Sequence, residues 1–471
     1  MAPRMDALRT QLFSWAQARS DQPVTAGFVP GRIEVFGRHT DYAGGRTVVC
    51  AIDRGFLFAA VPRQDRRVRI REDSPEFEPV EFDLDPDLEP VVGQWANYPM
   101  TMARRLERNF PGRLRGIDLA FASTMPVGSG MSGSSALMMM VYTALAASNG
   151  LETAPAFREN IRTPVDLAVY LACAENGQSF RGLAGDRGVG TFGGSEDHAA
   201  ILNSTDGRVT LFSFSPPELL QVVPWPAGWS MVVGFSGVRA EKTREALEKY
   251  NMASRRARDA VRVFNRLAGT AHPTLREVVD HGPKPGGEGW LSALDTAAAG
   301  MDPRPAPDLA GRVRQFILED RTHVPGAIEA LKARDLARFG RLVSDSHRAS
   351  KRDLWNIVPE IDYLMESACE LGAAGASGFG AGFGGSIFAV TTVDRAETLR
   401  DAWAAAYRRK FPVRAAGADF FIARPSPGIQ LWKDTGVVRY VDTVFSPRSQ
   451  DPPGASGTRP PATPATAPRG L

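Results

Sequence analysis

Apolar residues recur with two different periods along this chain, and the change between the periods predicts an α/β protein. Short runs of alternating or β-branched apolar residues, bounded by glycine, proline or charged residues, predict strands. These strands cover 27–36, 48–62, 117–122, 199–202, 209–214, 229–235, 386–391 and 417–424. Charged alternation predicts an exposed hairpin over 66–82. Longer stretches with apolar residues every three or four positions predict helices over 5–18, 95–110, 137–147, 164–179, 239–262, 311–319, 325–333, 335–350, 360–371 and 394–409.

The length of 471 residues exceeds one typical domain, so we expect two domains with extensions. A proline-rich connection places the boundary near 205–225, and we assign 1–212 to the first domain and 213–445 to the second. Residues 275–310 are rich in glycine, proline and aspartate and predict an insertion. The last segment, 446–471, has almost no bulky apolar residues and predicts a disordered tail.

Composition excludes several function classes. A net charge of +3 gives no argument for nucleic-acid binding, and no run approaches the ~18 apolar residues of a membrane span. Charged residues within the first ten positions replace the apolar core of a signal peptide. The three cysteines are far apart, without metal-binding spacing: Cys50, Cys173 and Cys369. We therefore expect reduced thiols and a cytoplasmic protein.

The stretch 126–137, PVGSGMSGSSAL, is the strongest chemical signal in the sequence. It joins a predicted strand to a predicted helix, so its free N–H groups and the positive end of the helix dipole face the turn. Glycines let the backbone approach a ligand closely, and serine hydroxyls can bond phosphate oxygens or a hydrated magnesium ion. This combination suits a polyphosphate.

Three other interpretations of this stretch compete with a polyphosphate site. Residues 128–133 fit the G-x-G-x-x-G pattern of dinucleotide folds, but Glu152 lacks the preceding strand that this pattern requires. No lysine stands where a Walker-type loop needs one. A glycine- and serine-rich turn without any ligand stays open when the segment is taken alone.

Three motifs in order resemble the GHMP small-molecule kinases, and the galactokinase family most closely. GRIEVFGRHTDYAGG (31–45) resembles the signature G-R-[VI]-N-[LI]-I-G-E-H-x-D-Y-x-G-G. The stretch 126–137 resembles the phosphate loop P-x-G-x-G-L-S-S-S-A-A, and GFGAGFGG (378–385) resembles the late T-G-[AG]-G-F-G-G segment. Trp95 with the following Asn97 and Tyr98 is a secondary match, and the whole resemblance covers roughly 27–425.

The resemblance implies a two-domain fold, with an S5-like N-terminal half, a ferredoxin-like C-terminal half and ATP between them. It implies these nucleotide-binding residues: Trp95, Pro126, Gly128, Ser129, Gly130, Ser132, Gly133, Ser134, Ser135, Gly380 and Gly382. It implies these sugar-binding residues: Arg38, His39, Asp41, Tyr42 and Tyr250. His39 alone would more often be a structural histidine, and Tyr250 an exposed helix residue.

Catalysis in the family uses an aspartate paired with the arginine of the first motif. The stretch GGSEDH resembles the family segment G-[IS]-M-D-Q, which places Asp197 at the catalytic position and Arg32 at its partner. A sugar hydroxyl is a poor nucleophile, so a carboxylate that takes its proton suits the chemistry, and an arginine keeps that carboxylate ionised. Asp186 competes for the role. Asp197 is preferred because the apolar strand predicted at 199–202 follows it directly.

Each of these groups could instead have a purely structural role. Asp197 alone could be a helix N-cap, and Arg32 alone a surface salt bridge. Glu175 would share a magnesium ion with Ser134 or Ser135, since Mg²⁺ takes few protein ligands and keeps several waters. A buried, satisfied carboxyl is the alternative for Glu175.

One departure from the signature concerns specificity. Arg38 stands where the family has a glutamate associated with the galactose 6-hydroxyl. A guanidinium suits a carboxylate, so a galacturonate-like sugar is one hypothesis, and a pentose such as arabinose, which lacks that carbon, is another. In the third hypothesis Arg38 turns into solvent and galactose still binds.

These observations predict a cytoplasmic, Mg²⁺- and ATP-dependent sugar 1-kinase whose partners are a sugar and ATP. We expect a monomer or small homo-oligomer, with no nucleic acid and no membrane. The rival from another class is a non-catalytic sugar and ATP sensor, which Gly133 in place of a family serine would suit. A mevalonate- or homoserine-type kinase is disfavoured by the sugar-type residues 39–42.

Overall fold

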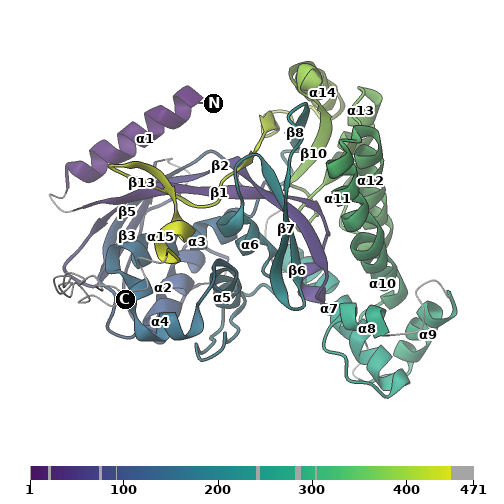
Figure 1. Ribbon diagram of the computed structural model, residues 1–471, viewed down its shortest axis with the longest axis horizontal. Helices are drawn as coiled ribbons and strands as arrows, with labels where there is room; N and C mark the ends of the chain where they lie inside the picture. Colours follow the sequence, from purple (N-terminus) through teal and green to yellow (C-terminus); the bar gives the residue numbers. More distant parts are fainter. Residues whose placement is uncertain are drawn as a thin grey trace, which may run out of the picture.

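Two β-sheets and the helices that cover them form the protein (Figure 1), and this confirms the predicted α/β class. The computed structural model describes residues 2–19, 23–73, 77–91, 93–239, 244–281, 288–302 and 305–446. The tail predicted from residue 446 onward therefore lies outside the described residues, apart from Ser446. No helix in these ranges has the length and apolar character needed to cross a membrane.

The first sheet has the strand order β14-β13-β1-β2-β5-β3-β4, with β6 and β12 pairing with β2, and β7 with β6. Its strands are β1 (Thr25–Phe36), β2 (Arg46–Pro62), β3 (Arg67–Glu72), β4 (Val80–Asp83), β5 (Ile117–Ser123), β6 (Arg208–Phe214), β7 (Pro217–Pro224), β12 (Pro425–Ser426), β13 (Gln430–Lys433) and β14 (Gly436–Arg439). The long antiparallel pair of β1 and β2 is its centre, and only β3 and β5 pair in parallel among these strands.

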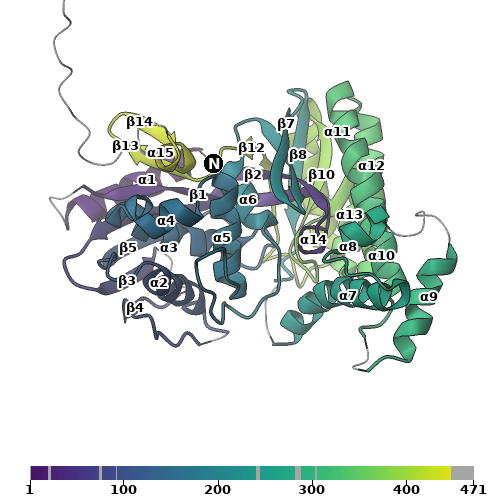
Figure 2. The ribbon, with the colours of Figure 1, turned by 60° about the horizontal axis from the view of Figure 1, so that its bottom comes forward.

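Helices cover both faces of this sheet (Figures 1 and 2). On one face, Leu12 and Ala16 of α1 (Ala2–Gln17) pack against Ala26 and Phe28 of β1. The other face carries α2 (Asn97–Asn109), α3 (Gly133–Asn149), α4 (Pro155–Asn160), α5 (Pro164–Asn176) and α6 (Glu196–Asn203). Because α3 is buried on nearly all sides, the turn that precedes it is held rigidly between sheet and helix.

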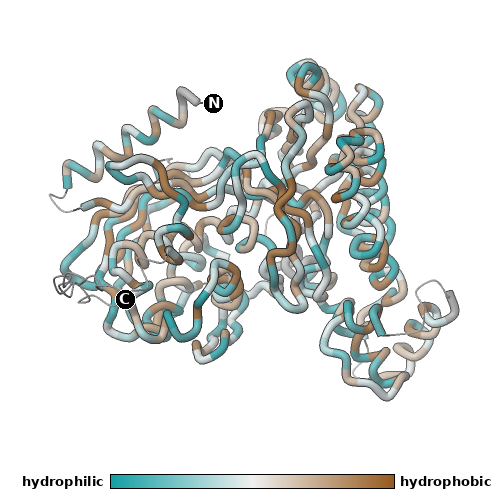
Figure 3. Tube along the Cα trace, in the orientation of Figure 1, coloured by the Kyte–Doolittle hydropathy of each residue, from teal (hydrophilic) through white to brown (hydrophobic). Residues whose placement is uncertain are grey.

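The second sheet is antiparallel, in the order β11-β8-β10-β9. Its strands are β8 (Trp229–Phe235), β9 (Gly375–Gly378), β10 (Ser386–Thr392) and β11 (Asp419–Ala423). Helices α11 (Val324–Ala333), α12 (Leu336–Ala349), η4 (Ser350–Leu354), α13 (Pro359–Glu370) and α14 (Ala396–Lys410) lie beside it. One face packs on α13 and α14, while the other joins the core of the first sheet through residues such as Met231 and Phe388. Apolar segments accordingly run along the central strands (Figure 3).

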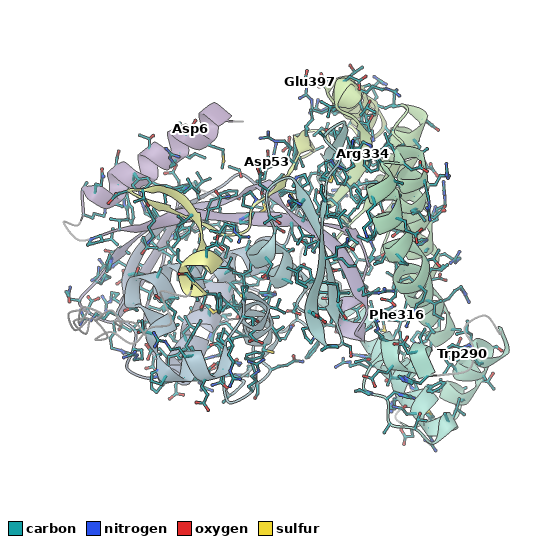
Figure 4. The ribbon with its side chains drawn as sticks, viewed as in Figure 1. Asp6, Asp53, Trp290, Phe316, Arg334 and Glu397 are labelled. Atoms are coloured by element: carbon teal, nitrogen blue, oxygen red, sulfur yellow. The ribbon has the colours of Figure 1, made fainter. Side chains whose placement is uncertain are left out.

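A helical lobe follows β8 and extends from the body of the molecule. It comprises α7 (Arg244–Ala268), α8 (Leu275–His281), α9 (Glu288–Ala299), α10 (Leu309–Ile317) and the π-helical turn η3 (Leu318–His323). Phe316 lies where the lobe meets the body and Trp290 lies within the lobe (Figure 4). Ala43 and Tyr42, from the loop between β1 and β2, pack on the same apolar cluster, so the lobe supports that loop. The insertion predicted at 275–310 falls in this lobe.

Two predictions about elements were wrong, and one group of elements was missed. Residues 199–202 lie in helix α6, not in a strand, because an apolar run of four residues carries too little periodicity to separate the two. The connection after β6 contains strand β7, whose flanking prolines suggested a loop. The segment after β11 adds β12–β14 and α15 (Tyr440–Val444) to the first sheet, which the sequence did not reveal. Strands before and after residue 212 belong to the same sheet. The boundary between two domains at this residue stays a prediction.

Helix α12 lies close to strand β9 of the second sheet because Gly340 and Gly375 have no side chains at the contact. This contact gives a test of the fold. A Cβ on Gly340 would lie 2.1 Å from the Ala374 carbonyl oxygen. We predict that Gly340→Ala lowers the free energy of unfolding by about 2 kcal/mol, since the helix must move off the sheet. Urea denaturation measures this. The matched control is Gly228→Ala, where an added Cβ meets nothing within 4 Å, and an equal effect in both variants would contradict the account.

Candidate active site

A cavity of about 900 Å³ lies where loops from both sheets meet. Its walls are the serine-rich turn (124–132) between β5 and α3, the signature loop (37–45) between β1 and β2, the start of α6, and the glycine loop (379–385) between β9 and β10. Its size is at the upper end of small-molecule sites. Of the predicted residues, those that line it are Arg32, His39, Asp41, Tyr42, Trp95, Pro126, Gly128, Ser129, Gly130, Ser132–Ser135, Glu175, Asp197, Gly380 and Gly382.

The serine-rich turn presents the N-terminus of α3 to the cavity. Gly128, Gly130 and Ser132 have positive φ angles of 68°, 76° and 60°, which bend the backbone around the turn. In this turn, the first backbone hydrogen bond of helix α3 runs from the Ala136 N–H to the Ser132 carbonyl oxygen. The Ser132 hydroxyl is buried and has no partner among the described residues. These groups form the kind of anion site that helix N-termini provide.

Arg32 joins three parts of the site. Its Nε and Nη2 lie 2.8 and 2.7 Å from Asp197 Oδ1, and its Nη1 donates to the Gly130 carbonyl at 2.8 Å. Burial opposes the guanidinium charge, but the carboxylates of Asp197, Glu196 and Glu34 outweigh burial and raise the pKa of Arg32. The arginine therefore stays charged and fixes the Asp197 carboxylate beside the serine-rich turn.

Asp197 lies in the first turn of α6, and Ser195 occupies the N-cap position. Its side chain is about one third exposed and faces the cavity, so capping does not account for it. Asp186, the competing candidate, is bonded to Arg104 at 2.9 Å, and its side chain is 2% exposed. Because Asp186 is not among the residues lining this cavity, the geometry favours Asp197.

Glu175, at the end of α5, lies beside the same turn. Ser135 Oγ donates to Glu175 Oε2 at 2.7 Å and approaches Asp197 Oδ2 at 3.5 Å. His198 Nε2 is 3.2 Å from Glu175 Oε2. No group of three or more His, Cys, Asp or Glu side chains with metal-site geometry occurs among the described residues. One carboxylate with neighbouring hydroxyls nevertheless fits Mg²⁺, which takes its remaining ligands from phosphates and water.

The signature loop turns sharply at His39, whose φ is 57°. Its Nδ1 lies 2.8 Å from the Tyr42 hydroxyl and its Nε2 lies 3.3 Å from the Ala381 carbonyl of the glycine loop. Burial, followed by the charge of Arg312, lowers the pKa of His39 to about 3, so the imidazole is neutral at pH 7. Burial also raises the pKa of Asp41 to about 6.

Arg38 does not line the cavity, although the sequence placed it at the sugar. Its Nη2 donates to Ser377 Oγ on β9 at 3.0 Å, and its Nη1 lies 3.4 Å from Ser350 Oγ of η4. The side chain is buried behind the signature loop, with 3% of the residue exposed. Tyr250 lies on α7, and its side chain is outside the described part of the structure.

Three cavity-lining carboxyls were not identified from the sequence: Glu34, Glu72 and Glu196. Glu34 Oε2 accepts a bond from Gly380 N–H at 2.9 Å, and its Oε1 accepts one from His39 N–H at 3.3 Å. It therefore ties the glycine loop to the signature loop. The available signal was a charged residue in an otherwise apolar strand, two positions after Arg32 and so on the same face.

Aromatic residues also line the cavity. Trp95 contacts Phe77 and Phe121, with ring centroids 5.9 and 6.4 Å apart. Flat apolar surfaces of this kind suit a nucleotide base.

Glu34 gives a pH-dependent prediction. Burial raises its pKa from 4.5 to about 7, although Arg38 and Arg32 oppose the shift. Between these values the unfolded chain loses a proton that the folded protein keeps, so this group destabilises the fold as pH rises. We predict that Glu34→Gln removes at least ~1 kcal/mol of the stability loss between pH 5 and 8.

Chemical denaturation across that pH range measures the effect. The exposed Glu81→Gln variant is the control and should follow the wild type. Parallel stability curves for wild type and Glu34→Gln would contradict the assignment.

Comparisons with known proteins agree with this geometry. Residues 16–62 match the galactokinase galactose-binding signature, 97–173 the GHMP kinases N terminal domain, and 327–409 the GHMP kinases C terminal family. A galactokinase of Roseiflexus sp. (strain RS-1) is 31% identical over 404 residues, which is 85% of this chain and 91% of the relative. A galactokinase of Actinobacillus pleuropneumoniae is 27% identical over 406 residues, or 86% of this chain and 94% of that one.

Solved structures give the same family. The crystal structure of Lactococcus lactis galactokinase complexed with galactose superimposes with a TM-score of 0.71 at 25% identity, covering 90% of this chain and 99% of that one. Methanococcus jannaschii mevalonate kinase, at 14% identity and a TM-score of 0.52 over 86% of this chain and 99% of its own, shares the fold alone. The chain therefore belongs to the galactokinase family of GHMP kinases.

Proposed function

We propose that this kinase transfers the γ-phosphoryl group of ATP to the anomeric hydroxyl of a galactose-type sugar, giving the sugar 1-phosphate and ADP. The observation that carries the proposal is the Arg32–Asp197 pair, which lies between the signature loop and the serine-rich turn. A sugar held by the first segment and a triphosphate held by the second would meet at this pair. The three free cysteines support a cytoplasmic location, where thiols stay reduced.

Asp197 takes the proton of the attacking hydroxyl while the new oxygen–phosphorus bond forms and the bond to the ADP oxygen breaks. Its side chain is exposed to the cavity and oriented by Arg32, so it can reach a bound hydroxyl without reorganising. The Arg32 charge also compensates negative charge on the transferring group, since such reactions depend mainly on positioning and electrostatics.

The serine-rich turn binds the phosphates through the N-terminal N–H groups of α3 and the hydroxyls of Ser132, Ser134 and Ser135. Trp95 and its aromatic neighbours receive the adenine. Glu175 and Ser135 would hold Mg²⁺ between the α5 end and the phosphates. When bound, the ion neutralises phosphate charge.

The Lactococcus lactis protein was crystallised with galactose, and this supports a galactose-type substrate here. His39, Asp41 and Tyr42 line the cavity as the signature implies, and they supply the acceptors and donors that ring hydroxyls need.

Asp197→Asn tests the proposal. We predict that this variant loses about 10³-fold or more in kcat, because an amide cannot take the proton, while ATP binding persists. Coupled detection of ADP release with galactose, together with nucleotide titration, measures both properties.

The control is Asp206→Asn, an exposed position in the turn after α6, which should keep wild-type activity. Full activity of Asp197→Asn would contradict the assignment. A wild-type protein that binds ATP and sugar without turnover would favour the sensor hypothesis.

A further inference from the structure

A continuous helical segment lies behind the signature loop. Helix α10 runs directly into the π-helical turn η3, and Phe316 of α10 lies where the lobe meets the body (Figure 4). The segment carries polar residues that are 0% exposed and do not line the cavity: Arg312, Gln315, Glu319 and Asp320. Buried polar groups need hydrogen-bond partners, and these four bond the backbone of the signature loop and the residue after it. We call them the bracing residues.

The two bracing residues of α10 hold carbonyl groups near the start of the loop. Gln315 Nε2 donates to the Arg38 carbonyl oxygen at 2.8 Å, and Arg312 Nη2 donates to the His39 carbonyl oxygen. Arg312 Nη1 also donates to Gln315 Oε1 at 2.6 Å, so each side chain fixes the other. The φ of 57° at His39 is uncommon for a residue with a side chain, and such a conformation persists where surrounding contacts hold it.

The two bracing residues of η3 hold the ends of the loop. Glu319 Oε2 accepts the Gly37 N–H at 3.0 Å, and Asp320 Oδ1 accepts the Arg46 N–H at 2.8 Å. Thr40 Oγ1 lies 2.7 Å from the Gly37 carbonyl oxygen and 2.8 Å from the Arg46 carbonyl oxygen, which ties the same two ends together. Adjacent carboxylates thus reach the loop from one π-helical turn, and such turns are frequent at functional sites.

Glu319 is held as a carboxylate. Burial opposes its negative charge, but the hydrogen bond and the charge of His323 outweigh burial and lower the pKa of Glu319. His323 Nδ1 lies 3.0 Å from Glu319 Oε1. An ionised acceptor makes a stronger hydrogen bond with the Gly37 N–H than a neutral one would.

The braced loop is the one that carries the side chains assigned to the sugar. His39, Asp41 and Tyr42 line the cavity, while the bracing residues contact the backbone of the same segment. A loop that is fixed before binding loses less conformational freedom when the ligand arrives, which raises affinity. The serine-rich turn is held by other contacts, from Arg32 and α3.

We propose that Arg312, Gln315 and Glu319 are positioning residues that raise sugar affinity by fixing the signature loop, without touching either substrate. This inference rests on the proposed kinase function, which takes the signature loop as the sugar site. It assigns the helical lobe a role in sugar binding and leaves ATP binding to the other parts of the cavity.

The first test uses Gln315→Glu and Arg312→Lys. Gln315→Glu keeps an acceptor for Arg312 but leaves two acceptors facing each other at the Arg38 carbonyl. Arg312→Lys keeps the charge but loses the planar fork that reaches two acceptors. We expect the galactose Kd from calorimetry and the galactose KM to rise at least ~10-fold in each variant. The KM for ATP and the kcat at saturating galactose should change less than ~3-fold, because a bound sugar itself orders the loop.

The second test compares two changes at Glu319. Glu319→Gln keeps an acceptor for the Gly37 N–H, so its galactose Kd should stay within ~3-fold of wild type. Glu319→Met removes the acceptor and should raise the galactose Kd at least ~10-fold. Calorimetry reports the affinity of the folded protein, so a residue that only stabilises the fold would leave the Kd unchanged in both variants.

Arg314→Lys is the matched control. It makes the same change as Arg312→Lys on the same helix, at a side chain that bonds Asp353 at 2.8 Å. Its galactose Kd should equal that of wild type. If one variant fails to fold, as seen by circular dichroism, the variants at the other two bracing positions still test the proposal.

Unchanged galactose affinity in the folded variants Gln315→Glu, Arg312→Lys and Glu319→Met would overturn the proposal. An equal loss of ATP affinity, or an equal loss of galactose affinity in Arg314→Lys, would overturn it as well. Absence of turnover in wild type, with calorimetry still showing weaker galactose binding in the variants, would contradict the kinase function alone and support the bracing residues.

Discussion

The geometry of the site depends on one side chain, the Arg32 guanidinium. It leaves β1 toward the cavity and reaches Asp197 on α6 and the Gly130 carbonyl in the serine-rich turn. These three segments are far apart in the sequence, and the fold brings them together. Because Arg32 is 5% exposed, its charge is balanced almost entirely by protein carboxylates rather than by water. Loss of this balance would leave buried charges unpaired, which is costly.

Glu34 lies on the same face of β1 as Arg32 and adds contacts to two loops. It lies two residues after Arg32 and binds the amides of His39 and Gly380. A Cβ on Gly380 would lie 2.7 Å from the Gly130 carbonyl oxygen, so the glycine loop packs directly on the serine-rich turn. Strand β1 therefore organises loops from both sheets around one cavity. Alternation of Arg32 and Glu34 with the core residues Ile33 and Val35 allows one strand to serve core and site together.

The sequence was informative where function and local structure follow from contiguous residues. The strand–turn–helix around 126–137 and the long helices emerged from periodicity and glycine placement, and the motifs identified the family. The sequence was not informative where tertiary contacts determine the secondary structure or the strand pairing. The short run at 199–202 is helical because α5 and the first sheet surround it, and β12–β14 return to the first sheet through pairing over several hundred residues.

Side-chain direction was the other limit. Arg38 and Glu34 are both charged residues of the signature segment, and nothing in their spacing tells which faces the cavity. The positive φ of His39 and the two serines that accept the guanidinium place Arg38 outside, and these are properties of the folded chain. Glu196 matches no position of the motif, whereas its neighbour Asp197 does, although both lie in the first turn of the same helix.

The most direct test of the central claim identifies the phosphorylated oxygen. The protein is incubated with ATP, Mg²⁺ and galactose, and the product is examined by phosphorus–proton correlation in nuclear magnetic resonance. The account predicts that phosphorus couples to the anomeric proton, so that Asp197 and Arg32 act on the C1 hydroxyl. Phosphate at C6 or another ring position, or no sugar phosphate at all, would contradict it.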